Sequence, residues 1–267
     1  MYFSVGRFPY FGSVAQVKPV NVQPQDRHVQ IANNQYDSFE SKNPKRYATE
    51  ISITRLAKQN PNIEKILKNA GIEYNLNIED WNKILDGHCT DTANIAEGIV
   101  RNLPFALESK ADLNSIKDAA YLHDIGKVFI PTEILNKNGK LDDKETEIVH
   151  KHSELGYELL KNSDISPKTL ELIRNHHQNA QKTGYPKVDK NFYADLDLQI
   201  LSIADKYSAL TEERPYKKPL TREQALTIIR PDVRRGKINP LVYNALVNYT
   251  DEIALNNKET KIESCGH

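Results

Sequence analysis

The sequence has few cysteines, no long apolar run and no net charge. Its 267 residues include only two cysteines, Cys89 and Cys265, which are too few for a disulfide framework. No stretch approaches the roughly 20 consecutive apolar residues that a membrane-spanning helix needs. The 36 basic and 36 acidic side chains cancel, so no global field recruits a nucleic acid polymer or an anionic membrane surface. Any phosphate binding must therefore be local.

Two further patterns are missing. The N-terminus lacks a basic segment followed by a continuous apolar segment, so it does not resemble a secretory signal. With the low cysteine content, this predicts a soluble, cytoplasmic protein. Sustained strand-like alternation is also missing, which disfavours a β-sheet, and no internal repeat of 20 to 50 residues is visible.

Four segments are expected along the chain. Residues 1–47 combine several prolines with many Gln and Asn and show no regular period, which predicts a disordered N-terminal arm. Residues 48–85 are expected to form a short helical segment that packs on a catalytic domain at residues 86–255. The polar residues 256–267 are expected to form a frayed tail.

Helix caps recur throughout the domain and predict an all-α fold. Three residue pairs have the composition of helix starts: Asn60-Pro61, Ser166-Pro167 and Asn239-Pro240. Two further pairs have capping-box spacing: Asp142 with Glu145, and Thr221 with Gln224. Gly71 can close the helix that Pro61 begins. Residues 178–194 contain glycine and proline that break any helical pattern, and the length of this loop suggests that it carries function.

Histidines and aspartates gather at the ends of the expected helices. The pair His123-Asp124 follows an apolar helical stretch and precedes Gly126, which can end that helix. Five of the eight histidines and two aspartates recur in this way: His88, His123, His152, His176, His177, Asp124 and Asp205. A carboxylate can bridge two cations while neutral imidazoles fill the other positions, and this ligand mix suits iron, manganese or zinc better than calcium. The pattern indicates a metal-dependent phosphohydrolase with Asp124 as the bridge.

The remaining three histidines, His28, His150 and His267, are interpreted as ordinary hydrogen-bonded or surface residues. His150 lies two residues before His152, and residues two apart face different directions on a helix. We therefore expect His150 to be solvated rather than a metal ligand.

These residues resemble the HD-domain phosphohydrolases, and more specifically their HD-GYP subfamily. The similarity extends from about His88 to Pro240. It rests on His88, on the run His123 to Pro131 that is close to the subfamily's HDIGK and Ile-Pro signature, on His152 with Gly156, on His176-His177 followed after six residues by Gly184-Tyr185-Pro186, on the run Asp205 to Thr211, and on Glu213 to Lys217. The resemblance implies an HD-domain helical bundle with a long GYP-type loop.

The resemblance also implies two divalent transition-metal ions, iron or manganese. One ion would lie among His88, His123, Asp124 and Asp205, and the other among Asp124, His152, His176 and His177. Three-metal members carry a Glu one helical turn before the first histidine, where this chain has Ile84, which cannot ligate. Two cations roughly 3.5 to 4 Å apart lower the pKa of a bridging water, so that hydroxide is available to attack phosphorus.

A cyclic dinucleotide, in the first place cyclic di-GMP, is the substrate that the resemblance implies. Lys127, three residues after Asp124, can place its ammonium against a phosphate oxygen, and we expect both residues to be catalytic. The resemblance places Arg214 and Lys217 on the substrate phosphates, with ordinary solvated charge as the alternative. Tyr185 could stack on a guanine or simply pack the loop.

The chain departs from the subfamily in the loop. The subfamily usually has His-His-Glu and an Asp-Gly pair before Gly-Tyr-Pro, whereas this chain has Gln178 and Gln181-Lys182. Another nucleotide substrate is therefore one alternative. A weakly active HD domain that binds a nucleotide or a protein is another, although retention of all seven ligands favours an enzyme. A signalling protein or a second copy of the chain stays open as a partner.

Overall fold

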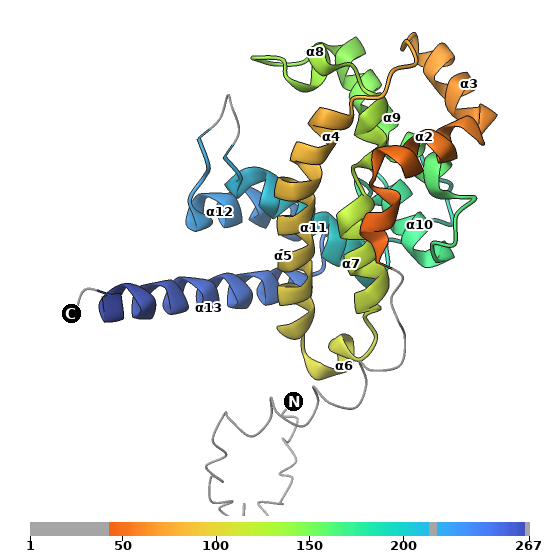
Figure 1. Ribbon diagram of the computed structural model, residues 1–267. Helices are drawn as coiled ribbons and strands as arrows, with labels where there is room; N and C mark the ends of the chain where they lie inside the picture. Colours follow the sequence, from red (N-terminus) through yellow and green to blue (C-terminus); the bar gives the residue numbers. More distant parts are fainter. Residues whose placement is uncertain (1–42, 214–217, 265–267) are drawn as a thin grey trace, which may run out of the picture. The chain divides into compact units, whose positions relative to one another are not determined.

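The computed structural model describes residues 43–213 and 218–264, with side chains described up to residue 255. All regular secondary structure in these residues is helical, which confirms the expected all-α fold (Figure 1). In chain order the elements are η2 (Pro44–Tyr47), α2 (Glu50–Lys58), α3 (Pro61–Ala70), α4 (Ile78–Ile84), η3 (Leu85–Cys89), α5 (Thr90–Arg101), α6 (Phe105–Glu108), α7 (Leu113–Leu122), η4 (Ile125–Phe129), α8 (Thr132–Leu135), α9 (Asp143–Leu160), α10 (Pro167–Asn175), α11 (Leu196–Thr211), α12 (Arg222–Arg234) and α13 (Pro240–Ser264).

The helices begin where the sequence places their caps. The side chains of Asn60 and Ser166 accept hydrogen bonds from the first-turn amides of α3 and α10, whose first residues are prolines. Gly71 ends α3 with a left-handed φ of 67°. Both predicted capping boxes are formed, at the starts of α9 and α12. These local signals therefore fix the helix boundaries that position the site.

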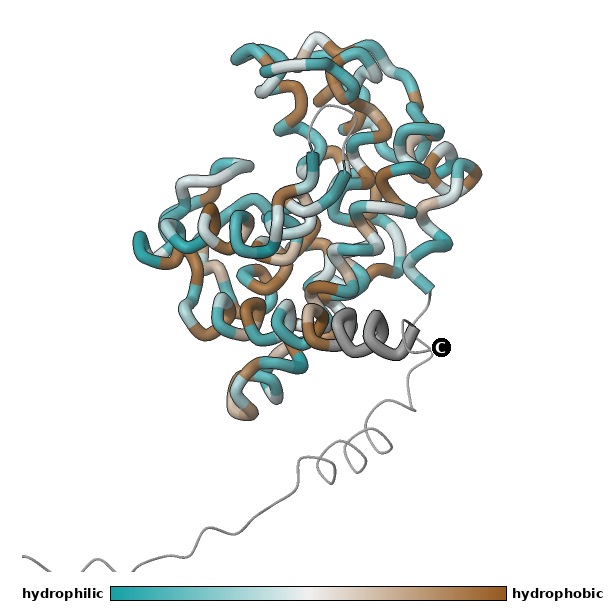
Figure 2. The backbone as a smooth tube through the Cα atoms, turned by 90° about the vertical axis from the view of Figure 1, so that its left-hand side faces the viewer, coloured by the Kyte–Doolittle hydropathy of each residue, from teal (hydrophilic) through white to brown (hydrophobic). Residues whose placement is uncertain are grey.

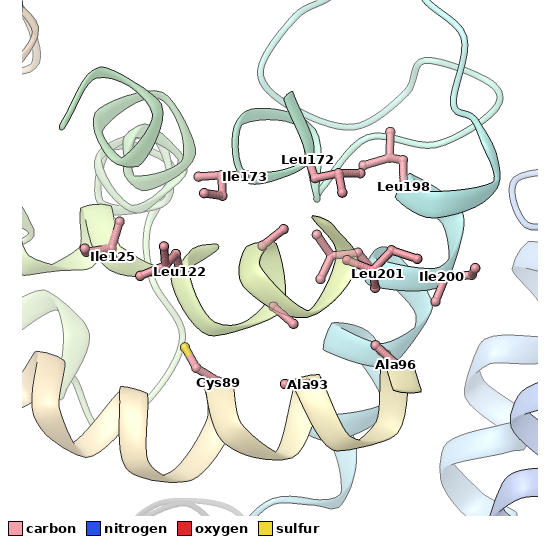
Figure 3. Close-up of a cluster of buried hydrophobic side chains, with 14 of the residues drawn as sticks. Cys89, Ala93, Ala96, Leu122, Ile125, Leu172, Ile173, Leu198, Ile200 and Leu201 are labelled. Atoms are coloured by element: carbon pink, nitrogen blue, oxygen red, sulfur yellow. The ribbon is translucent and has the colours of Figure 1, made fainter. Parts of the chain in front are cut away.

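Helices α5, α7 and α11 form the centre of the fold. Small buried side chains of α5, among them Ala93 and Ala96, face Leu122 of α7 and Leu201 of α11 (Figure 3). Small residues at a helix contact allow the two backbones to approach closely. In Figure 2, hydrophobic and hydrophilic residues recur along the same helices, as expected of helices that bury one face. The three helices bring ligands from distant parts of the sequence together.

Helix α4 continues into α5 through a single π-helical turn, η3, which contains His88 (Figure 1). Single π turns inside helices are often found at functional sites. Before this turn, the buried indole of Trp81 donates a hydrogen bond to the Ala48 carbonyl at 3.0 Å, and Asn60 donates one to the Glu158 carbonyl of α9 at 2.6 Å. The segment boundaries given above stay predictions.

Gly126 does not end helix α7, contrary to expectation. The helix already ends at Leu122, and Gly126 lies in the following short helix η4. A Cβ atom on Gly126 would lie 1.9 Å from the His152 carbonyl oxygen and 2.6 Å from the Gly156 nitrogen of α9. Glycine is required because η4 and α9 are in direct backbone contact. This contact brings Asp124 beside His152.

Three further features complete the fold. The expected loop is present between the end of α10 and the start of α11 at Leu196. Helix α13 runs across α5 and continues to Ser264, past residue 256, where the polar composition predicts a frayed tail (Figure 1). Among the described residues, none of the helices combines the length and apolar character that crossing a bilayer requires. The arm predicted at residues 1–47 lies almost wholly outside the described residues.

Candidate metal centre

The seven candidate ligands converge from separate elements. They are His88 in η3, His123 and Asp124 between α7 and η4, His152 in α9, His176 and His177 after α10, and Asp205 in α11. All except His177 are buried, and the His177 side chain is 27% exposed. Burial of so many polar groups is costly unless they are paired or bind a cation.

The ligands form two groups. Ligand atoms of His88, His123 and Asp205 lie within 4.8 Å of one another, and so do those of His152, His176 and His177. Asp205, a member of the first group, also lies near the second: its Oδ1 is 3.0 Å from His88 Nε2, and its Oδ2 is 3.7 Å from His177 Nδ1. Each of these two groups could hold a metal ion.

Asp124 lies between the two groups. Its Oδ2 lies 3.4 Å from His123 Nε2 and 3.7 Å from His88 Nε2. Its Oδ1 lies 3.3 Å from His152 Nε2 in the other group. One carboxylate therefore presents one oxygen to each group, which is the arrangement that a bridging ligand requires.

Backbone hydrogen bonds fix the orientation of three of the histidines. In each, Nδ1 lies against the carbonyl oxygen three residues earlier: His123 on Ala120 at 2.8 Å, His152 on Val149 at 2.6 Å and His176 on Ile173 at 2.7 Å. A carbonyl only accepts, so Nδ1 carries the proton, and in the neutral ring Nε2 presents a lone pair to the site. This tautomer is the one that metal ligation through Nε2 needs.

The electrostatics favour the ligating charge states. Burial lowers the pKa of His152 to about 3 and that of His177 to about 4, and it also lowers the pKa of His176. Burial alone would raise the pKa of Asp124, but the Lys127 ammonium and the His123 ring outweigh it and hold this pKa well below its usual range. At neutral pH, the second group therefore offers neutral imidazoles beside an ionised carboxylate, which are the forms that bind metal ions.

The pKa of His123 shifts in the opposite direction from those of the three histidines in the second group. Burial would lower its pKa, but the Asp124 carboxylate beside it has the larger combined effect, and the pKa is raised. Asp205 also stays ionised: burial opposes this, but the hydrogen bond from His88 and the neighbouring His177 ring lower its pKa. A cation in the first group would displace the proton from His123.

Lys127 contacts the bridge directly. Its Nζ lies 2.5 Å from Asp124 Oδ2, and it lines a cavity of about 470 Å³ that opens over the ligands. Lys206, Asp232 and Lys237 line the same cavity on the side of α11 and α12. Arg214 and Lys217, the expected phosphate contacts, lie outside the described residues. Their roles stay predictions.

Tyr185 is packed between two imidazoles. Its ring lies 3.7 Å from the His150 ring at an interplanar angle of 17°, and 4.4 Å from the His177 ring at 32°. Both faces of the phenol therefore have a neighbour, which favours the packing role over stacking on a guanine. His150 is partly exposed and belongs to neither group of ligands, as expected, and in addition one face of its ring stacks on Tyr185.

Three further residues lie near the ligands and were not predicted from the sequence. Ser208 Oγ lies 3.1 Å from His88 Nδ1, and Glu212 Oε2 lies 3.6 Å from the same atom. The spacing of three residues between Asp205 and Ser208 on one helix could have indicated the first contact. The Cys89 thiol is fully buried and lies close to His123 and Asp124. Its only sequence signal is its position next to His88.

A protein-family model described as HD domain matches residues 40–242. Among curated proteins, the 3'3'-cGAMP-specific phosphodiesterase 2 of Vibrio cholerae is 38% identical over 150 residues, or 54% of this chain and 28% of that protein. The cyclic di-GMP phosphodiesterase of Thermotoga maritima is 34% identical over 162 residues, or 60% of this chain and 44% of that protein. The chain thus spans less than half the length of these relatives.

A solved structure supports the fold. The protein Bd1817 of Bdellovibrio bacteriovorus, described as a HDG"Y"P protein, aligns with a TM-score of 0.53 over 84% of this chain and 76% of that chain. Sequence identity in this alignment is 13%, so the similarity establishes a shared fold and nothing more.

Proposed function

Because this chain belongs to the HD domain family, whose model matches residues 40–242, we propose that it is a metal-dependent phosphodiesterase that hydrolyses a cyclic dinucleotide. Family membership confirms the resemblance read from the sequence. The observation that carries the proposal is the position of Asp124, whose two oxygens face two groups of buried ligands. This geometry supports a site for two ions, with iron or manganese as the proposed occupants.

The proposed substrate is cyclic di-GMP, with 3'3'-cGAMP as a second candidate. The Thermotoga maritima relative is named for the first compound and the Vibrio cholerae relative for the second, at comparable identities of 34% and 38%. Both compounds contain two phosphodiester linkages between purine nucleosides. The cavity over the ligands is lined by Lys127, Lys206 and Lys237, of which Lys206 and Lys237 are paired with Asp232, so Lys127 is the ammonium best placed to meet a phosphate of the substrate.

The seven ligands and Lys127 would have different roles in the reaction. When bound, divalent metal ions would lower the pKa of water and neutralise charge on the phosphoryl oxygens. The seven ligands would hold these ions, with Asp124 shared between them. Lys127 has three N–H donors and uses one on Asp124 Oδ2, so it can offer another to a non-bridging phosphate oxygen. Its charge would be most useful where negative charge develops during the reaction.

The proposal is tested by incubating the manganese- or iron-loaded protein with cyclic di-GMP, 3'3'-cGAMP and cyclic di-AMP, and separating the products by chromatography. We expect a linear dinucleotide or mononucleotide from one or both of the first two compounds. The Asp124→Ala variant is the matched negative control for contaminating activity. Metal-loaded protein that leaves all three compounds intact would contradict the proposed activity and favour a binding module.

A further inference from the structure

The loop between α10 and α11 contains a buried glutamine, Gln178, directly after the two histidines His176 and His177. We propose that Gln178 is a positioning residue, which ties the loop into the conformation that holds His177 at the metal centre. Its effect on turnover rests on the proposed function, whereas its effect on the loop does not.

Both ends of the Gln178 carboxamide are used. Gln178 is buried, with only 2% of its surface exposed. Its Nε2 donates to the Pro186 carbonyl at 2.6 Å, and its Oε1 accepts from the Gly184 amide at 3.2 Å. One side chain thus holds the first and last residues of the Gly184-Tyr185-Pro186 segment. An amide matches this pair of partners because it offers one donor and one acceptor.

A glutamate cannot make both bonds. An ionised carboxylate only accepts, so one of its oxygens would face the Pro186 carbonyl oxygen without a proton between them. A buried polar group that loses its partner retains the cost of its desolvation. The glutamate that is usual at this place in the resembling subfamily therefore does not fit this loop. Gln178 is a functional part of the loop and not merely a lost acid.

The tied segment packs directly on His177. A Cβ atom on Gly184 would lie 1.9 Å from the His177 carbonyl oxygen, so the backbone of the segment touches the backbone of the ligand. Next to this contact, the Tyr185 ring lies against the His177 ring at 4.4 Å and is backed by His150 at 3.7 Å. His177 is the most exposed of the ligands, so it depends on this packing more than the buried histidines do.

The tip of the loop is held as well. The Ala180 amide donates to the Lys237 carbonyl at 3.3 Å, and the Gln181 side chain donates to the Arg235 carbonyl. Both acceptors lie in the turn between α12 and α13, and Lys237 lines the cavity above the ligands. Gln178 stands where the subfamily usually has Glu, and Gln181 stands at the first position of the usual Asp-Gly pair. Both side chains donate an amide hydrogen bond to a backbone carbonyl: Gln178 within the loop, and Gln181 to the turn between α12 and α13.

The test compares Gln178→Glu and Gln178→Met with Gln59→Glu, which makes the same charge change at an exposed residue far along the chain. In metal-free protein, we expect trypsin to cleave after Lys182 about tenfold faster in both Gln178 variants, because the loop loses a buried hydrogen bond. Circular dichroism before digestion confirms that each variant is folded. Gln178→Met serves if Gln178→Glu does not fold.

A second readout reports on the ligand itself. The visible absorption of cobalt(II)-loaded protein depends on the coordination geometry, so we expect altered bands in both Gln178 variants and unchanged bands in Gln59→Glu. Neither measurement needs hydrolytic activity, so they separate this proposal from the proposed function. Wild-type cleavage rates and an unaltered cobalt spectrum in the Gln178 variants would overturn the proposal, even if the protein proves to be a phosphodiesterase.

Discussion

The Nε2 atoms of His152 and His176 lie 3.1 Å apart, while the Nδ1 atom of each ring lies against a backbone carbonyl. The carbonyls take the ring protons, so two lone pairs point at each other in a buried site. Such a contact is unfavourable unless a cation lies between or beside the two nitrogens. The chemistry of the donors therefore fits a metal ion in the second group of ligands.

Asp124→Ala is expected to remove metal from both groups. Wild-type protein expressed with iron and manganese should carry about two equivalents of metal, as a two-metal site would. Loss of a shared carboxylate should reduce this to well below one equivalent and abolish hydrolysis. Elemental analysis of the purified variant measures the content, with Asp91→Ala, an exposed aspartate of α5, as the control. A variant that keeps two equivalents would show that Asp124 is not the bridge.

Lys127→Ala should separate metal binding from turnover. Lys127 contacts the bridge but belongs to neither group of metal ligands, so we expect the metal content to stay near wild type. Loss of one charged donor to the phosphate should lower kcat by roughly 100-fold, as for other donors that stabilise transition-state charge. Steady-state kinetics with parallel elemental analysis measure both effects. An unchanged kcat would refute the phosphate role.

The metal-free protein should lose stability as the pH falls below about 6.5. Burial lowers the pKa of His152 from 6.5 to about 3 and that of His177 to about 4. Below pH 6.5 the unfolded chain therefore takes up protons that the folded protein does not, and stability falls progressively until the pH reaches the folded values. His123, whose pKa is raised, acts at higher pH: its stabilising contribution is gained as the pH falls toward 6.5 and is already present below that value. Thermal unfolding of chelator-treated protein between pH 7.5 and 4.5 measures the slope, and a flat profile would contradict neutral buried histidines.

Lys182→Gly should stabilise the loop. Lys182 has a φ of 58°, in the left-handed region, where a side chain costs roughly 1 to 2 kcal/mol. Glycine removes this cost, but it gives the unfolded chain more conformational entropy, worth about 0.5 to 1 kcal/mol, and loses the exposed hydrogen bond from the Lys182 ammonium to the Lys190 carbonyl, so a net gain of at most about 1 kcal/mol is expected. Chemical denaturation measures the difference. Lys187→Gly, at a loop residue without a positive φ, is the control and should be destabilised.

The sequence predicted the helices well because their caps are local. Asn60, Ser166 and the two capping boxes act within one turn, so their effect does not depend on distant packing. The candidate ligands could also be predicted, because the family resemblance specifies their order along the chain. The structure then brings them together, although their identity as ligands stays a prediction.

Contacts between elements distant in the sequence could not be predicted in this way. The stacking of His150 on Tyr185 depends on a loop that folds back over α9, and no periodicity within α9 reveals it. The hydrogen bonds of Gln178 to Gly184 and Pro186 depend on the shape of the same loop. The role of Gly126 was misread for a related reason: its requirement comes from a neighbouring backbone and not from the end of its own helix.

The contact between Gly126 and the His152 carbonyl sets a limit on how the centre can vary. Because two main chains touch at this point, the separation between Asp124 and His152 is determined by backbone atoms and not by the size of core side chains. Repacking the surrounding core should therefore change the melting temperature before it changes the coordination geometry. Selection for a different substrate could then act on the cavity walls while the spacing of the ligands stays constant.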